Sequence, residues 1–138
     1  MDALKSTVLL VEDSKFLRIA TERALSKAGF GVSSAVDGEQ ALQLANEQPP
    51  DIIVLDMMLP KLSGPDVLKA LKSNPATKDI PVIVLSSLSQ RNEEKLLGEG
   101  AAAYFEKSTL ELDKSSDRLA TVIKTTLREV SRRTKPNS

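Results

Sequence analysis

Carboxylate, hydroxyl and amino side chains follow four of the five short apolar runs in this 138-residue chain. Glu12 and Asp13 follow the first run, Asp56 the third, Ser86 the fourth, and Lys107 stands just beyond the fifth. Carboxylates gathered at one place repel one another. Mg²⁺, which prefers oxygen ligands, offsets this repulsion with its positive charge. An aspartate can attack a phosphoryl group, so an Asp, a metal and a Lys suffice for phosphoryl transfer.

The five apolar runs alternate with segments of helical periodicity. We expect strands at residues 7–11, 31–35, 51–55, 81–85 and 101–105. Runs that are apolar on both faces indicate strands covered by helices on both sides, as in a parallel sheet. A strict strand–helix alternation predicts a doubly wound sheet with right-handed crossovers. Because parallel strands point the same way, the residues that follow them meet at one edge, where ligands of such folds bind.

Five helices are expected between and after the strands, the fourth being short and polar at about residues 89–97. Ser14 can cap the first helix, Gly29 suits its left-handed exit, and residues 63–66 outline a capping box before the third. The first helix is expected to bury one stripe, formed by Phe16, Leu17, Ala20, Ala24, Leu25 and Ala28. The fifth places another set on one face: Leu119, Val122, Ile123, Thr126, Leu127 and Val130.

Composition narrows the possible functions. Nineteen basic residues balance nineteen acidic ones, which argues against a nucleic-acid or membrane surface. No apolar run reaches the ~18 residues of a membrane span, and residues 1–7 lack the apolar stretch of a signal peptide, so we expect a cytoplasmic protein. Histidine and cysteine are absent, which excludes Ser–His and Cys–His catalysis and thiolate metal sites. The length fits one domain, expected at residues 1–131, with 132–138 a polar tail or the start of a linker.

The chain resembles a response-regulator receiver domain of the CheY-like superfamily over roughly residues 6–130. The resemblance rests on an ordered set of motifs at residues 8–14, 51–56, 58–60, 64, 81–86, 100–101 and 104–107. It implies a flavodoxin-like α/β fold, in which a five-stranded parallel sheet of order 2-1-3-4-5 is flanked by five helices.

The resemblance also implies roles for the residues at the strand ends. Asp56 is the expected phosphoacceptor. Asp13, and Glu12 through a water, are expected to hold Mg²⁺ together with Asp56 and the backbone carbonyl of Met58. Lys107 is expected to pair with Asp56 before transfer and with the phosphoryl group afterwards.

Two further residues are implied to form a switch. Ser86 is expected to donate its hydroxyl to a phosphoryl oxygen, and Tyr104 to turn inward as Ser86 moves. The surface of the fourth helix, fifth strand and fifth helix then changes its preference for partners. The implied donor is a phosphohistidine of a sensor histidine kinase or phosphotransfer protein, and the downstream target is unknown. Such a domain catalyses its own phosphorylation and dephosphorylation and is not an enzyme acting on other substrates.

The sequence departs from the family pattern at several positions, among them Ser108 and Ser87, and leaves alternatives open. Ser108 stands where the family has a proline joined by a cis bond; a cis bond here would cost ~2.5–4 kcal/mol, so either the loop is trans or it holds strain. A degenerate receiver that binds partners without phosphorylation is one alternative. A phosphatase with an aspartate nucleophile is a second, although Met58 stands where its second Asp is expected. A nucleotide- or flavin-binding domain is weaker, because no glycine-rich loop follows the first strand.

Overall fold

The computed structural model of the chain describes residues 6–86, 100–106 and 115–134. The strands are β1 (Thr7–Val11), β2 (Gly31–Ala35), β3 (Ile52–Asp56), β4 (Val82–Ser86) and β5 (Ala103–Glu106). The helices within the described ranges are α1 (Lys15–Lys27), α2 (Gly38–Glu47), α3 (Gly64–Ser73) and α5 (Ser115–Thr134). The short helix expected at about residues 89–97 lies outside these ranges.

The five strands pair in parallel in the order β2-β1-β3-β4-β5, which confirms the predicted topology. β3 and β4 are buried along their whole length, as expected for apolar strands inside a doubly wound sheet. Both end one residue later than predicted, because Asp56 still pairs with Leu85 and Ser86 with Glu106. The two polar residues are therefore the last residues of their strands, held in the sheet by its register.

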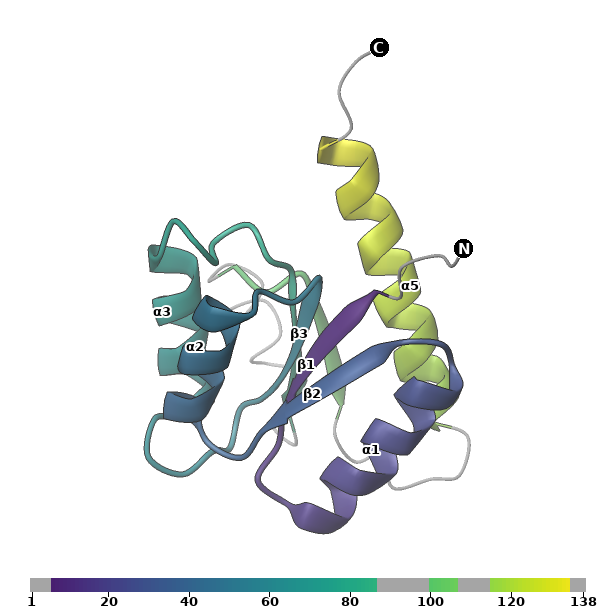
Figure 1. The fold of residues 1–138 in the computed structure, drawn as a ribbon, viewed down its shortest axis with the longest axis horizontal. Helices are drawn as coiled ribbons and strands as arrows, with labels where there is room; N and C mark the ends of the chain where they lie inside the picture. The colour runs from purple at the N-terminus through teal and green to yellow at the C-terminus, as the bar shows by residue number, and fades with distance from the viewer. Residues whose placement is uncertain (1–5, 87–99, 107–114, 135–138) are drawn as a thin grey trace.

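Two helical layers cover the sheet, one on each face (Figure 1). Successive side chains of a strand point to opposite faces, so each strand contributes to both layers. The layer of α2 and α3 encloses Leu9, Val11, Ile53, Leu55, Val82 and Val84. The layer of α1 and α5 encloses Val8, Leu10, Ile52, Val54, Ile83 and Leu85.

The first helix begins as predicted, and its predicted stripe is confirmed at Leu17 and Leu25, which are buried, but not at Phe16. The Ser14 hydroxyl accepts a hydrogen bond from the Leu17 amide at 3.4 Å and caps α1. Phe16, predicted to lie in the buried stripe, is 82% exposed, and this prediction was wrong. The buried residues of α1 are Leu17, Thr21 and Leu25, which are spaced by four. That spacing alone defines one helix face and leaves Phe16 on its solvent side.

α5 is the longest described helix, with 20 residues or about 30 Å of axial length. It packs Leu119, Ala120 and Ile123 against the sheet, and its second half extends past the end of the strands (Figure 1). The helix runs to Thr134 and so passes residue 131; the predicted division at that point stays a prediction. Among the described helices, none combines the length and the apolar character that crossing a membrane requires.

Candidate functional site

The loop from β1 to α1 contributes two adjacent carboxylates that differ in exposure. The Glu12 amide donates to the Ala35 carbonyl of β2 at 3.0 Å, which continues the sheet by one residue. The Glu12 side chain is fully buried, and its Oε2 accepts a hydrogen bond from the Ser14 amide at 3.0 Å. Asp13 is exposed. Glu12 is therefore built into the loop, whereas Asp13 presents its carboxylate to solvent.

Arg18 ties this acidic loop to α1. Its Nη1 donates to the backbone carbonyl of Glu12 at 3.1 Å and to that of Asp13 at 3.4 Å. Arg18 is not among the site residues predicted from the sequence. Its place one helical turn beyond the Ser14 cap is the signal that could have identified it, because a side chain there can reach back to the loop carbonyls.

Asp56 is the last residue of β3 and is fully buried. Its Oδ1 accepts a hydrogen bond from the Met58 amide at 3.0 Å, and the Met57 amide donates to the Leu85 carbonyl of β4 at 2.9 Å. The carboxylate is thus held by the loop that follows it. The backbone of Met58 lies next to Asp56, although the residue as a whole is 59% exposed.

Gly64, the first residue of α3, brings its backbone against the same loop. Its amide faces the Met57 carbonyl at 3.3 Å. A Cβ at this position would lie 2.3 Å from the Met57 Cα and 2.7 Å from the Asp56 carbonyl oxygen. No side chain fits into that space without moving backbone, so glycine here lets α3 begin directly against the loop.

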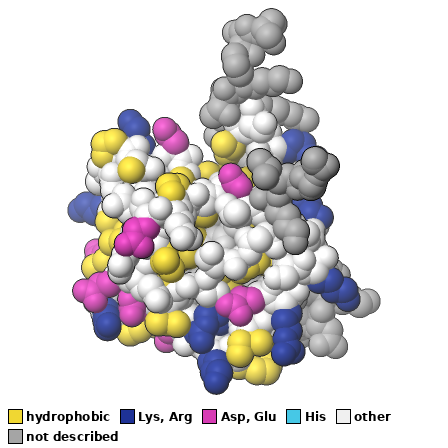
Figure 2. Space-filling view, in the orientation of Figure 1, with side chains coloured by type: hydrophobic (Ala, Val, Ile, Leu, Met, Phe, Trp, Pro, Cys, Tyr) yellow, Lys and Arg dark blue, Asp and Glu magenta, His cyan; other side chains and the backbone are white. Residues whose placement is uncertain are grey.

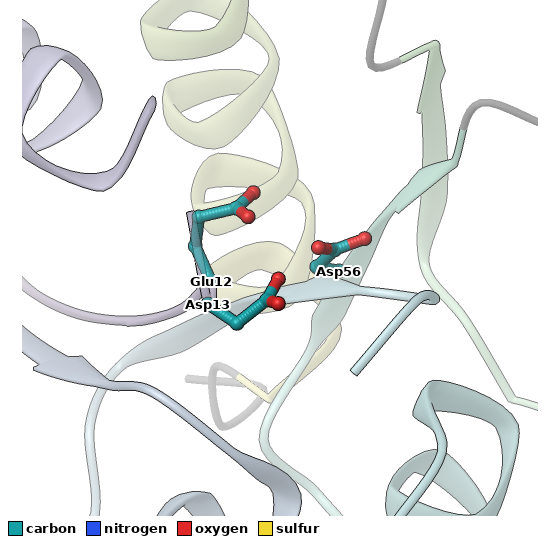
Figure 3. A group of neighbouring side chains, drawn as sticks. All are labelled: Glu12, Asp13 and Asp56. Atoms are coloured by element: carbon teal, nitrogen blue, oxygen red, sulfur yellow. The ribbon is translucent and has the colours of Figure 1, made fainter. Parts of the chain in front are cut away.

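Three carboxylates converge at the carboxyl ends of β1 and β3. One carboxylate oxygen from each of Glu12, Asp13 and Asp56 lies within 4.8 Å of the other two. In Figure 3 the three side chains point toward one common space between the two strands. An all-oxygen set of three carboxylates, two buried and one exposed, suits a hard divalent cation such as Mg²⁺, which would offset their mutual repulsion.

Ser86 lies on β4, the strand next to that of Asp56, and Tyr104 lies on β5, one strand further. Ser86 ends β4 and is fully buried; its neighbour Leu85 pairs with Asp56 in the sheet register. Tyr104 pairs with Val84, is partly buried, and packs against the core of the α2–α3 layer. Because paired residues share a face and side chains alternate, Ser86 and Tyr104 lie on the same face of the sheet. Lys107 and Ser108 fall in the part of the chain that the structure leaves undescribed.

A charged contact outside the carboxylate cluster was not anticipated from the sequence. Lys61, in the loop between β3 and α3, places its Nζ 3.5 Å from Asp37 Oδ2 and 3.8 Å from Glu39 Oε1. Asp37 also caps α2, since its Oδ1 accepts a hydrogen bond from the Gln40 amide at 2.8 Å. That hydrogen bond, helped by the Lys61 ammonium, holds the pKa of Asp37 below its ordinary value of 3.8.

The lowered pKa of Asp37 gives a testable pH dependence. A carboxyl group whose pKa is lower in the folded state stabilises the fold above its ordinary value of 3.8, and this contribution is lost as the pH falls through the folded-state pKa. Asp37→Asn should therefore unfold more easily than the wild type near neutral pH, and the two should converge in acid. Urea unfolding between pH 7 and about pH 2 measures this difference. A difference that stays constant to the acid end would contradict the assignment.

The fold and the site together define a class of protein. A parallel sheet of order 2-1-3-4-5 with its polar cluster at the ends of β1 and β3 is a flavodoxin-like α/β protein with its site at the topological switch point. Residues 8–119 match the response regulator receiver domain family. The chain belongs to this family and is a receiver domain of the two-component type.

Individual relatives agree with this assignment. The chain is 46% identical over 110 residues to a gliding motility regulatory protein of Myxococcus xanthus, a match that covers 78% of this chain and 14% of that protein. It is 42% identical over 86 residues to Protein PilG of Pseudomonas aeruginosa, covering 62% of each. Each match thus covers less than two thirds of the length of the relative.

Solved structures of receiver domains superpose over nearly the whole chain. The receiver domain of the Francisella response regulator 1452 has a TM-score of 0.81 at 29% identity, covering 91% of this chain and 98% of that one. A response regulator of Desulfuromonas acetoxidans has a TM-score of 0.78 at 31% identity, covering 89% and 97%.

Proposed function

We propose that Asp56 accepts a phosphoryl group from a phosphohistidine of a sensor histidine kinase or phosphotransfer protein. An Asp56 carboxylate oxygen attacks phosphorus and forms a P–O bond while the P–N bond to the donor imidazole breaks. The electron pair of that bond returns to the imidazole, which takes up a proton. The observation that carries the proposal is the convergence of the Glu12, Asp13 and Asp56 carboxylate oxygens within 4.8 Å.

The residues around Asp56 are suited to hold Mg²⁺. Asp13 and Asp56 would be direct ligands, joined by the Met58 backbone carbonyl and, through a water, by Glu12. When bound, the ion neutralises the carboxylates and the phosphoryl oxygens. The hydrogen bond from the Met58 amide to Asp56 supports this set, because it keeps the backbone of the loop beside the acceptor carboxylate.

After transfer, the modified site is proposed to change the surface of the domain. Ser86 would donate its hydroxyl to a phosphoryl oxygen, Lys107 would pair with the phosphoryl group, and Tyr104 would turn inward. The common face of Ser86 and Tyr104 supports a link between them. The surface around β5 and α5 would then select a downstream target. On this proposal the domain, residues 1–131, is a cytoplasmic switch whose chemistry is limited to its own phosphorylation and dephosphorylation.

Metal removal tests the proposal directly. Wild-type protein incubated with a small acyl phosphate and MgCl₂ should gain one phosphoryl group, detected by intact-mass spectrometry. With excess EDTA the labelled fraction should fall to background, because nothing then offsets the repulsion between the carboxylates and the incoming phosphate. Absence of labelling with Mg²⁺ would favour a degenerate receiver. Equal labelling with EDTA would remove the metal from the mechanism.

A further inference from the structure

The loop between β3 and α3, residues 57–63, determines where the proposed metal ligand Met58 lies. The amide of Met58 donates to Asp56, so a shift of the loop would move both the carboxylate and the neighbouring carbonyl. Gly64 supports the loop at its α3 end, through the close approach to Met57. Leu59 and Leu62 pack against the core of the α2–α3 layer, whereas Lys61, next to Leu62 in the loop, is exposed.

Lys61 has a backbone φ of 66°, in the left-handed region that residues with a side chain rarely adopt. Such a conformation is costly and persists where the surroundings hold it in place. The ammonium of Lys61 reaches Asp37 Oδ2 at 3.5 Å and Glu39 Oε1 at 3.8 Å, both at the start of α2. The strained position is therefore linked by its own side chain to the neighbouring helix.

The first turn of α2 contacts the loop at a second point. A Cβ on Gly38 would lie 2.5 Å from the Leu62 carbonyl oxygen and 2.7 Å from Val67 Cγ2. α2 carries Glu39 and Glu47 and no basic residue, and acidic side chains gather on that side of the molecule (Figure 2). The start of α2 is thus held against the loop both by close packing at Gly38 and by the ion pairs of Lys61.

We propose that Asp37 and Lys61 are positioning residues for the metal site. They act through the loop: Asp37 is fixed by its cap hydrogen bond to Gln40, Lys61 is drawn to Asp37, and the loop then holds the Met58 carbonyl beside Asp56. The inference rests on the proposed function, because it assumes that Mg²⁺ binds at the three carboxylates. It adds that the start of α2, which contributes no ligand, increases the affinity of the site for Mg²⁺.

Loss of the Lys61 ammonium is expected to change the affinity for Mg²⁺ in opposite directions, depending on whether Lys61 positions the loop or acts only through its charge. Removing a cation near an anionic site strengthens binding of Mg²⁺ if only the electric field matters, and removing an anion weakens it. If the contact positions the loop, Lys61→Met and Asp37→Asn both weaken binding. Methionine keeps an unbranched side chain that is one atom shorter than lysine, and asparagine keeps an oxygen for the α2 cap.

The experiment is a titration of the full chain with MgCl₂, followed by amide NMR shifts and by calorimetry. We expect each variant to raise the dissociation constant for Mg²⁺ about two- to fivefold, the range for one exposed ion pair. The double variant should bind no more weakly than Lys61→Met alone, because Lys61→Met already removes the contact with Asp37 as well as the one with Glu39. Lys69→Met and Glu47→Gln are matched controls with the same charge changes on α3 and at the far end of α2, and both should bind like the wild type.

Three outcomes in the variants would overturn the proposal. If Lys61→Met binds Mg²⁺ more tightly and Asp37→Asn binds it more weakly, the two residues act only through their charges. Additive losses in the double variant would show that the two residues act separately. Equal losses in the control variants would show that overall charge is responsible. If the wild type itself binds no Mg²⁺, both the proposed function and this inference fail. The three variant outcomes, by contrast, overturn only the positioning role of Asp37 and Lys61.

Discussion

Asp56→Asn is expected to abolish labelling by an acyl phosphate and to leave the fold intact. An amide is not a nucleophile at neutral pH, so the labelled fraction measured by intact-mass spectrometry should fall to background. Asparagine has the shape of aspartate and keeps an oxygen that can accept from the Met58 amide. Removing one of three converging carboxylates relieves repulsion, so the free energy of unfolding should be equal to that of the wild type or higher.

Asp79→Asn is the matched control for this experiment. Asp79 is exposed and lies ahead of β4, away from the carboxylate cluster in the sequence, so the same chemical change should leave labelling at the wild-type level. Labelling that persists in Asp56→Asn would place the acceptor elsewhere. Loss of labelling in both variants would mean that the assay reports overall charge and not the acceptor.

Gly64→Ala is expected to lower the free energy of unfolding by about 3 kcal/mol, toward the upper end for overpacking. The added methyl group would meet the backbone of Met57 at 2.3 Å and of Asp56 at 2.7 Å, and backbone cannot rotate away as a side chain can. The loop must therefore move away from α3. Urea unfolding measures the loss of stability, and labelling by the acyl phosphate should fall in the variant protein that remains folded.

Gly31→Ala is the control for the close approach of Gly64 to the loop, because it makes the same substitution where there is room for a methyl group. A Cβ at Gly31 would lie 3.7 Å from Thr7 Cγ2, which is an ordinary van der Waals distance. Its free energy of unfolding should lie close to that of the wild type. If Gly64→Ala proved as stable as Gly31→Ala, the close approach of α3 to the loop would not be a constraint on this fold.

The convergence of Asp13 and Asp56 could be predicted because it follows from topology alone. Apolar runs that alternate with helical segments predict a parallel sheet, and a parallel sheet brings the ends of its strands to one edge. The predicted strand order and the resemblance to receiver domains are both confirmed. The roles given to Lys107 and Ser86 stay predictions, to be tested by labelling and mutation.

Features that depend on side-chain direction or on contacts between distant segments could not be predicted in the same way. Phe16 fits a helical period, yet the core selects the face of Leu17 and leaves Phe16 exposed. The position of Arg18 after the Ser14 cap is only a weak sequence signal, because its hydrogen bonds to the loop carbonyls depend on how the side chain turns back along α1. The contact of Lys61 with Asp37 joins residues 24 positions apart, and only the packing of α2 beside the loop brings them together.

The partly buried ring of Tyr104 has a practical consequence for optical spectroscopy. It is the single tyrosine of the chain, and the chain has no tryptophan, so its phenol dominates the ultraviolet fluorescence of the folded protein. A change in emission on addition of a phosphodonor would report the environment of one ring beside β4. The domain thus carries its own intrinsic probe, and no label has to be attached to follow that ring in real time.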